Sequence, residues 1–202
     1  MALLTREKPP SFTRRPSGFT LAEMMITLLV LAILIAGAVP AMGIFVEKSR
    51  LKGAAEALFS DLSYARSEAL KRNRDISVRF STDGATNWCF GIDETTSCNC
   101  TITDPTNASA CALNAAADLS SLTNVLKKTS AGEYPTIRLI SAAFSVNPVT
   151  TFTPRRGTAN GGTAVFRSSS GKEIRIVLSS LGRVMICSPA GAGKIGNYGD
   201  CP

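Results

Sequence analysis

The sequence predicts an α+β protein in which one long N-terminal helix packs on an antiparallel β-sheet. Three observations indicate this fold. Residues 24–46 form a nearly unbroken apolar run, an apolar stripe at helical spacing continues to about residue 72, and short alternating segments follow from residue 76. Helical and strand periodicity are the primary signals of secondary structure, and here each has its own part of the chain. The 202 residues leave room for one domain beyond the apolar helix.

The apolar run predicts a helix that spans a membrane. Its 23 residues would form a helix of roughly 34 Å, which matches the hydrocarbon thickness of a bilayer. The run is longer than the apolar core of a secretory signal, and no small-x-small cleavage site follows it. Four basic residues and one acidic residue precede it: Arg6, Lys8, Arg14, Arg15 and Glu7. The positive-inside rule therefore predicts a single-pass protein with a cytoplasmic N-terminus and the remainder outside the cytoplasm.

The helix is expected to continue beyond the membrane as an amphipathic segment, residues 47–72. Its apolar residues recur at spacings of four and three: Leu51, Ala55, Leu58, Leu62, Ala65 and Ala69. Such a stripe needs a partner layer, and the natural partner here is a sheet. Pro40 interrupts the apolar run between Gly37 and Gly43. Because proline inside a helix removes a backbone hydrogen bond, we expect a kink near Pro40.

Residues 73–202 are predicted to form a β-rich head. The expected strands are 76–80, 88–92, 137–146, 149–153, 163–167, 173–178 and 183–187. The first two flank a Thr-Asp-Gly turn signal and are expected to form a hairpin, and the last three are expected to form a meander. Residues 93–135 lack clear periodicity, which predicts a long insertion pinned by disulfides, with a short helix around 113–126.

All six cysteines follow the apolar run: Cys89, Cys98, Cys100, Cys111, Cys187 and Cys201. An even number of cysteines in an oxidising compartment predicts disulfides, and six cysteines allow 15 connectivities. One interpretation pairs Cys187 with Cys201, which would close a C-terminal loop. A metal site is the disfavoured alternative, because the chain has no histidine and no CxxC pair.

The composition argues against catalysis. With no histidine in the chain, histidine-based triads and the commonest metal ligand are excluded. The segment Gly191-Ala192-Gly193-Lys194 lacks the first glycine and the final Ser or Thr of a phosphate loop, since Ser188 and Ile195 stand at those positions. No pair of acidic residues suggests a reacting centre. We therefore expect no enzyme activity, no cofactor and no metal.

The N-terminal motif resembles a known leader. Gly18-Phe19-Thr20-Leu21-Ala22-Glu23 follows a short basic segment and leads directly into the apolar run. It is similar to the prepilin leader of type IV pilins and type II secretion pseudopilins, in which a membrane peptidase cuts after the glycine and methylates the new N-terminal residue. The resemblance implies that residues 1–18 are a leader, that Gly18 and Phe19 are the cleavage and methylation positions, and that residues 19–46 form the transmembrane helix.

Glu23 is the one charged residue between Arg15 and Glu47. A carboxylate in the first helical turn interacts favourably with the helix dipole, which would account for its being tolerated there. The resemblance favours a sharper interpretation, in which Glu23 pairs with the methylated amino group of Phe19 on a neighbouring subunit. An unpaired carboxylate inside an apolar bundle is costly, so Glu23 is the predicted filament-assembly residue.

The C-terminal half extends the resemblance. Residues 152–157, 161–163 and 174–184 are similar to the FimT/FimU minor pilins and the GspH-type minor pseudopilins. The resemblance covers nearly the whole chain, most weakly over 93–135. It implies a minor subunit that helps to initiate pilus assembly or lies near the filament tip, first in the inner membrane with a periplasmic head and then in the filament. The implied partners are the prepilin peptidase, other minor pilins, the major pilin and an inner-membrane assembly platform.

Two alternatives stay open. A minor pseudopilin of a type II secretion system would look the same in sequence, and a DNA-binding minor pilin for natural transformation would use exposed basic residues. The net charge of +7 falls to +4 without residues 1–18, which leaves 18 basic and 14 acidic residues. This excess alone is too mild to indicate nucleic acid.

Some FimT relatives bind DNA through a Gly-Arg-x-Arg stretch, and the corresponding Gly182-Arg183-Val184-Met185 lacks the second arginine. The residues proposed for DNA contact are Arg155, Arg156, Gly182 and Arg183, and the cations that could join them are Arg167, Lys172, Arg175 and Lys194. Because phosphate binding draws on several clustered cations, the missing arginine weakens this hypothesis. Solvated charges that keep the sheet edge soluble are the favoured interpretation.

Overall fold

The computed structural model describes residues 18–116, 123–146, 148–191, 193–196 and 198–202, and it does not describe the side chains of 38–41. The chain divides into two compact units, Met1–Ala41 and Met42–Pro202. The predicted leader thus lies almost wholly outside the described residues. One helix, α1 (Leu21–Arg72), contributes to both units.

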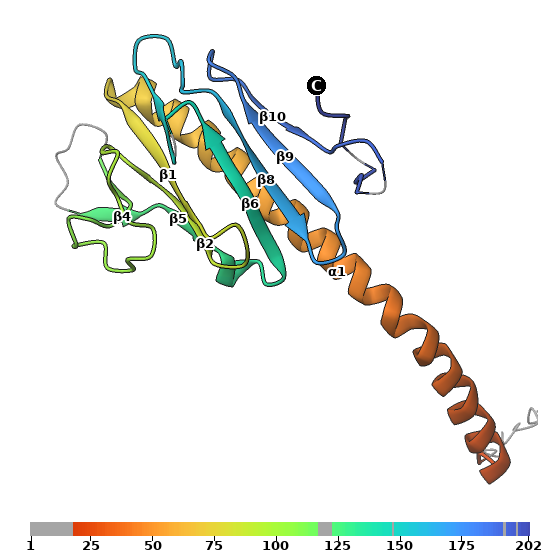
Figure 1. Cartoon of the computed structure of the whole chain (residues 1–202). Helices are drawn as coiled ribbons and strands as arrows, with labels where there is room; N and C mark the ends of the chain where they lie inside the picture. Colours follow the sequence, from red (N-terminus) through yellow and green to blue (C-terminus); the bar gives the residue numbers. More distant parts are fainter. Residues whose placement is uncertain (1–17, 117–122, 147, 192, 197) are drawn as a thin grey trace, which may run out of the picture. The chain divides into compact units, whose positions relative to one another are not determined.

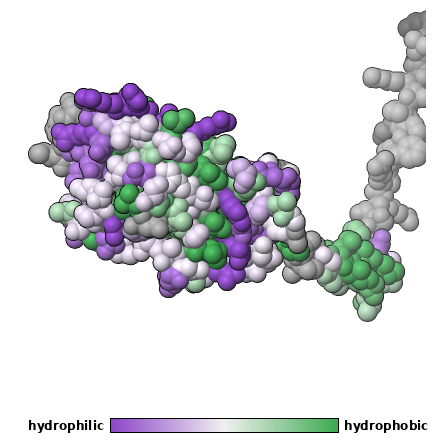
Figure 2. Space-filling model, turned by 45° about the horizontal axis from the view of Figure 1, so that its top comes forward, coloured by the Kyte–Doolittle hydropathy of each residue, from purple (hydrophilic) through white to green (hydrophobic). Residues whose placement is uncertain are grey.

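In the first unit, every described side chain of α1 up to Gly37 is exposed. Among the described residues, α1 is the one helix long and apolar enough to cross a membrane. Figure 2 shows hydrophobic residues gathered on the helix and scattered more singly on the head. A continuous apolar surface of this size needs lipid or protein around it. The predicted kink at Pro40 falls on residues whose side chains are not described, so it stays a prediction.

In the second unit, α1 buries the predicted stripe. The six predicted residues and Ala54 are all 0% exposed: Leu51, Ala54, Ala55, Leu58, Leu62, Ala65 and Ala69. They form one hydrophobic cluster with side chains from the strands. Figure 1 shows this part of the helix running behind the strands. Each buried leucine contributes about 1.5–3 kcal/mol relative to an exposed one, so the stripe accounts for the docking of the helix on the head.

Two four-stranded sheets and one small ribbon make up the head, and every strand pair is antiparallel. The first sheet, in the order β5-β2-β1-β7, consists of β1 (Ile76–Thr82), β2 (Trp88–Asp93), β5 (Lys128–Ser130) and β7 (Val149–Phe152). The second, in the order β10-β9-β8-β6, consists of β6 (Ile137–Phe144), β8 (Gly162–Ser168), β9 (Glu173–Leu178) and β10 (Val184–Cys187). The ribbon pairs β3 (Ala112–Asn114) with β4 (Asn124–Leu126).

The pairing confirms the predicted hairpin and meander. β1 pairs with β2 so that Phe80 faces Phe90 across the ladder. β8, β9 and β10 follow one another as neighbours, and the predicted turns between them end at Gly171 and Gly182, which have φ angles of 80° and 74°. Positive φ is the conformation that glycine adopts without strain. The alternating pattern of the sequence thus predicted these strands to within two residues.

Aromatic side chains join the two sheets. The rings of Phe80 in β1 and Phe144 in β6 stack with centroids 4.8 Å apart. Trp88 in β2 meets Phe166 in β8 edge to face at 5.2 Å, and its indole N–H donates a hydrogen bond of 2.9 Å to the carbonyl of Ile137. Such pairs add about 0.5–1.5 kcal/mol beyond the area they bury. One core therefore lies between the sheets and α1.

The short helix predicted around residues 113–126 is wrong for the described part of that segment. Residues 112–114 and 124–126 are instead strands β3 and β4, with Leu113 opposite Val125, and the rest of the segment lies outside the described residues. Leu113 is 1% exposed and belongs to the main core. Because this burial depends on contacts with distant residues, local helical spacing was misleading.

Two features fix the insertion on the head. Disulfides join Cys89 to Cys100 and Cys98 to Cys111, which confirms the prediction of a disulfide-pinned insertion. Arg72, at the end of α1, has a side chain only 3% exposed and forms a 2.6 Å ion pair with Glu68. Its guanidinium also donates a 2.8 Å hydrogen bond to the carbonyl of Asn114. The end of the helix is thereby tied to the start of the ribbon.

The third disulfide joins Cys187 to Cys201. It closes the C-terminal loop as the sequence suggested, and all six cysteines, each among the described residues, are paired. Loops of about 15 residues closed in this way contribute about 3 kcal/mol in the chain-entropy account.

Candidate functional site

The first candidate site is the N-terminal end of the described chain. Gly18 precedes α1, and Phe19 is 78% exposed. The hydroxyl of Thr20 accepts a 3.2 Å hydrogen bond from the backbone N–H of Glu23, as an N-cap does. Our sequence reasoning missed this cap, although Thr-x-x-Glu is the capping-box pattern that would have identified it.

Glu23 lies in the first turn of α1 and is exposed. None of the hydrogen bonds or ion pairs within the described residues involves its carboxylate. The helix dipole favours a carboxylate at this place, but it leaves both oxygens available. The geometry therefore permits a basic partner from outside the chain.

The second candidate site is formed by two glycine turns on the head. Gly157 and Gly182 have φ angles of 60° and 74°, and a Cβ at position 182 would overlap the carbonyl oxygen of Gly157. The backbone N–H of Ala159 donates a 3.0 Å hydrogen bond to the carbonyl of Ser180, which joins the same two turns. The structure thus brings the two predicted basic stretches, 155–156 and 183, side by side. Because Gly182 has no Cβ, the backbone of its turn can contact the backbone at Gly157.

Arg66 of α1 lies beneath both turns. Its Nε atom is 2.9 Å from the Cβ position of residue 157 and 3.2 Å from that of residue 182. This Nε is buried, and no hydrogen-bond partner for it lies among the described residues. A buried N–H without a partner costs about 1–3 kcal/mol. Sequence reasoning could not find Arg66, because its place depends on packing between α1 and the two turns.

We call Arg66, Arg155, Arg156 and Arg183 the arginine cluster. The last three are exposed, and no ion pair between them and an acidic residue occurs in the described part of the chain. A cavity of about 390 Å³ lies along 153–156 and Thr158. The cluster is a positively charged surface that could contact an anion.

Three other predicted cations form ion pairs inside the chain. Arg167 and Arg175 form ion pairs of 2.6 and 2.7 Å with Glu173, whose side chain is 8% exposed. Lys194 forms a 2.6 Å ion pair with Asp200. Burial alone would raise the pKa of Glu173, but hydrogen bonds from Arg167 and Arg175 outweigh it and hold that pKa below its ordinary value. The basic surface is therefore smaller than the sequence suggested.

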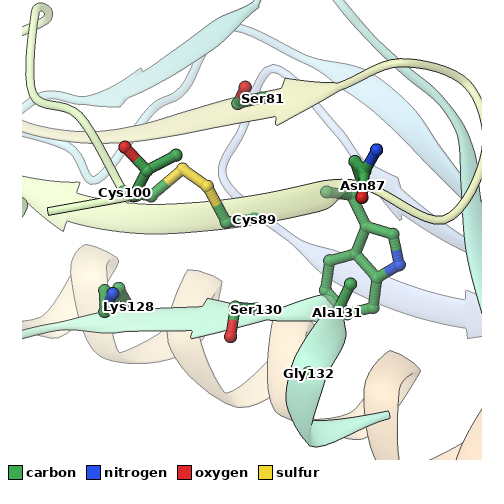
Figure 3. A pocket seen from close by; sticks show the side chains of 10 residues that line it. Ser81, Asn87, Cys89, Cys100, Lys128, Ser130, Ala131 and Gly132 are labelled. Carbon is green, nitrogen blue, oxygen red and sulfur yellow. A yellow bond between two sulfur atoms is a disulfide. The ribbon is translucent and has the colours of Figure 1, made fainter. Parts of the chain in front are cut away.

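A third feature is the cavity of about 360 Å³ beside the Cys89–Cys100 disulfide. Figure 3 shows the disulfide at one end, Asn87 toward the other, and Lys128 and Ser130 along one side. Lys128 is the one charged residue in its lining, so the cavity holds no acid–base pair. Within the described residues, no group of His, Cys, Asp or Glu is arranged to hold a metal ion.

Comparison with known families agrees with this arrangement. The family model described as type II transport protein GspH matches residues 54–182, which is more than half of the chain. The model of the prokaryotic N-terminal methylation motif matches residues 13–39 and includes Gly18, Phe19 and Glu23. No curated protein is similar enough to match.

Two solved structures are similar in fold, both crystal forms of the type IV minor pilin FimU from Pseudomonas aeruginosa. The form in space group P21 is 22% identical, with a TM-score of 0.46 over 76% of this chain and 98% of that one. The P65 form is also 22% identical, with a TM-score of 0.42 over 73% and 98%. From the match over 54–182 and the methylation motif that precedes it, we conclude that this chain belongs to the GspH family of pilin-like proteins.

Proposed function

We propose that the chain is a minor type IV pilin, a structural subunit that helps to initiate pilus assembly or lies near the filament tip. The observation that carries the proposal is the division of α1 into two kinds of surface. Its described residues up to 37 are exposed and almost wholly apolar, whereas its stripe from Leu51 to Ala69 is fully buried on the head. The first part must be covered by lipid before assembly and by neighbouring helices after it.

In this proposal a prepilin peptidase cuts between Gly18 and Phe19 and methylates Phe19. The chain then stays in the inner membrane, with its head in the periplasm, until assembly. An assembly platform passes it into a filament together with other minor pilins and the major pilin. The methylation motif over residues 13–39 supports the processing step, and the basic residues before the apolar run support the orientation.

Processing is tested by the intact mass of the chain from cells with and without the peptidase. We expect a mature chain that begins at Phe19 and carries one extra methyl group when the peptidase is present. Gly18→Val should keep Met1–Ser17 attached while the chain still enters the membrane, because the apolar run is unchanged. A chain that still begins at Met1 in the presence of the peptidase would contradict the proposal.

Assembly is tested at Glu23. Glu23→Gln keeps the size and helix propensity of the side chain but removes its charge, so it should leave membrane insertion intact and reduce incorporation into sheared filaments. The matched control is Asp75→Asn, an exposed acidic residue just after α1. Incorporation of Glu23→Gln at the wild-type level would refute the proposed pairing with Phe19 of a neighbouring subunit.

The family description favours one alternative, a minor pseudopilin of a type II secretion system. The same helix and head would then join a pseudopilus. Deleting this chain in its native cells separates the two proposals, because loss of pili with normal protein secretion supports a pilin and the reverse supports a pseudopilin.

The arginine cluster favours a second alternative, a DNA-binding minor pilin for natural transformation. Its cations lie on adjoining turns, which suits contact with a phosphate backbone. The ion pairs of Arg167 and Arg175 with Glu173, and the absence of the second arginine after Gly182, count against high affinity. Gel-shift measurements at two salt concentrations test this alternative, since binding that fails even at low salt excludes it.

A further inference from the structure

A cavity of about 300 Å³ lies between α1 and the C-terminal loop, apart from the arginine cluster. Its lining comes from four residues of the helix and three of the loop: Phe45, Lys48, Ser49, Lys52, Lys194, Ile195 and Gly196. The helical residues follow one another at spacings of three, one and three, so they share one face of α1. Three of the seven lining residues are lysines, and none is acidic.

The loop that closes this cavity is fixed to the fold. The Cys187–Cys201 disulfide joins its two ends. Within it, the backbone N–H of Ile195 donates a 3.0 Å hydrogen bond to the hydroxyl of Ser188, and Ile195 is 4% exposed. The hydroxyl of Tyr198 donates a 2.8 Å hydrogen bond to Glu56 of α1. These contacts hold the loop that forms this wall of the cavity in place on the fold.

One acidic residue near the cavity pairs with a lining lysine, and two others accept hydrogen bonds from hydroxyl groups. Asp200 pairs with Lys194 at 2.6 Å, and Glu56 accepts the hydrogen bond from Tyr198. Glu47 accepts a hydrogen bond of 2.6 Å from the hydroxyl of Ser169, on the turn after β8. Among the ion pairs of the described residues, none involves Lys48 or Lys52. Two of the three lining lysines, Lys48 and Lys52, therefore have no carboxylate partner within the described chain, whereas Lys194 is paired.

The position of the cavity along α1 matches the surface of a bilayer. Phe45 and Val46 end the apolar run, and Phe45 is 69% exposed. At about 1.5 Å per residue, Lys48 lies roughly 3 Å beyond Val46 and Lys52 roughly 9 Å. The headgroup layer on each side of the hydrocarbon core is about 5–7 Å thick. If α1 spans the membrane as proposed above, Lys48 lies within the headgroup layer and Lys52 just beyond it.

We propose that the cavity binds the headgroup of an anionic phospholipid in the outer leaflet, a ligand that would hold the head on the membrane until the subunit leaves for the filament. Lys48 and Lys52 supply the charge that attracts the phosphate, Ser49 offers a hydroxyl donor, and Phe45 lies beside the acyl chains. The proposal rests on the membrane stage of the proposed function. It assigns this lysine-lined cavity a role separate from assembly through Glu23.

The test uses the mature chain in nanodiscs that contain equal amounts of phosphatidylglycerol and phosphatidylcholine. Native mass spectrometry measures which lipids remain bound after the disc is removed. We expect phosphatidylglycerol to be enriched over phosphatidylcholine. Its retention should fall about fivefold in Lys48→Gln and about fivefold further in Lys48→Gln/Lys52→Gln. The matched control is Lys71→Gln, a lysine 63% exposed at the far end of α1, which should retain the lipid as the wild type does.

Three outcomes would overturn this inference: equal retention of the two lipids, wild-type retention by Lys48→Gln, or bound inorganic phosphate without a preference for phosphatidylglycerol. The Nζ atom of Lys52 also lies 5.9 Å from the ring centroid of Tyr198, so removing Lys52 can disturb the loop. The Lys48→Gln variant avoids this effect, and its result is therefore decisive. Failure of the chain to enter the disc would contradict the proposed membrane stage. A chain that enters without selecting a lipid would contradict only the assignment of the cavity.

Discussion

Glu173 shows how one residue changes the surface of the head. Its carboxylate is nearly buried and accepts hydrogen bonds from Arg167 at 2.6 and 3.1 Å and from Arg175 at 2.7 Å. Sequence reasoning placed both arginines among the cations that could bind DNA. It could not reveal their ion pairs with Glu173, because facing positions in β8 and β9 depend on register. Arg155, Arg156 and Arg183 were identified in advance, whereas Arg66 was not.

The ion pairs of Glu173 predict a dependence of stability on pH. The pKa of Glu173 is lowered in the folded chain, so its contribution is present above the unfolded pKa, about 4.3, and is lost as pH falls through the folded pKa. Glu173→Gln should lower the free energy of unfolding by about 1 kcal/mol at pH 7, a modest value because both arginines are partly solvated. The deficit should shrink as pH falls from 6 to 3.

The measurement is unfolding of the detergent-solubilised chain, followed by the fluorescence of Trp88, the one tryptophan in the sequence. The control is Asp75→Asn, at an exposed position just before β1, which should not reproduce this trend. A deficit of Glu173→Gln that stayed constant over the whole pH range would show that the ion pairs are not its source.

Among the elements, the long helix and the regular strands were the most predictable. The stripe of α1 and the alternation of β1, β2, β8 and β9 depend on local spacing, which the sequence carries directly. β3, β4 and β5 have three residues each, which is too short for a period to show. They are set by pairing with distant strands and by the Cys98–Cys111 disulfide.

The turn between β9 and β10 gives a prediction at the same scale. Gly182→Ala places a Cβ against the carbonyl oxygen of Gly157, at a φ of 74°. Both the strain and the overlap are unfavourable, so we expect the free energy of unfolding to fall by about 2–3 kcal/mol. Gly171→Ala is the matched control, because its φ is 80° but nothing lies within 4 Å of the added Cβ.

Gly171→Ala should therefore lower the free energy of unfolding by only about 1 kcal/mol, the strain alone. Urea unfolding followed by Trp88 fluorescence measures both variants. Equal losses in the two would show that the contact between Gly157 and Gly182 adds nothing to stability. That result would favour a direct role for Gly182 in binding.

For the whole molecule, sequence reasoning predicted the fold class, a candidate membrane helix and the existence of disulfides. It could not choose among the connectivities or show that the head has two sheets. Those features follow from one core, in which Phe80, Trp88, Phe144 and Phe166 hold the two sheets together against α1. Contacts of this kind join residues far apart in sequence, where periodicity carries no information.

The Cys187–Cys201 disulfide gives a prediction for the whole head. Cys187→Ala/Cys201→Ala should lower the free energy of unfolding by about 3 kcal/mol, because the unfolded chain is no longer constrained. Thermal unfolding of the oxidised chain measures the loss, with Cys89–Cys100 and Cys98–Cys111 intact in both samples. An unchanged midpoint would show that the loop is held by Ile195 and Tyr198 without the covalent bond.

Glu47 lies one residue beyond the apolar run and holds the turn after β8. The hydroxyl of Ser169 donates to it at 2.6 Å and the backbone N–H of Ser170 at 2.8 Å. The part of α1 that begins at Met42 is thus fastened directly to the turn after β8. A pulling force that reaches Glu47 would pass to β8 and β9 through these two hydrogen bonds.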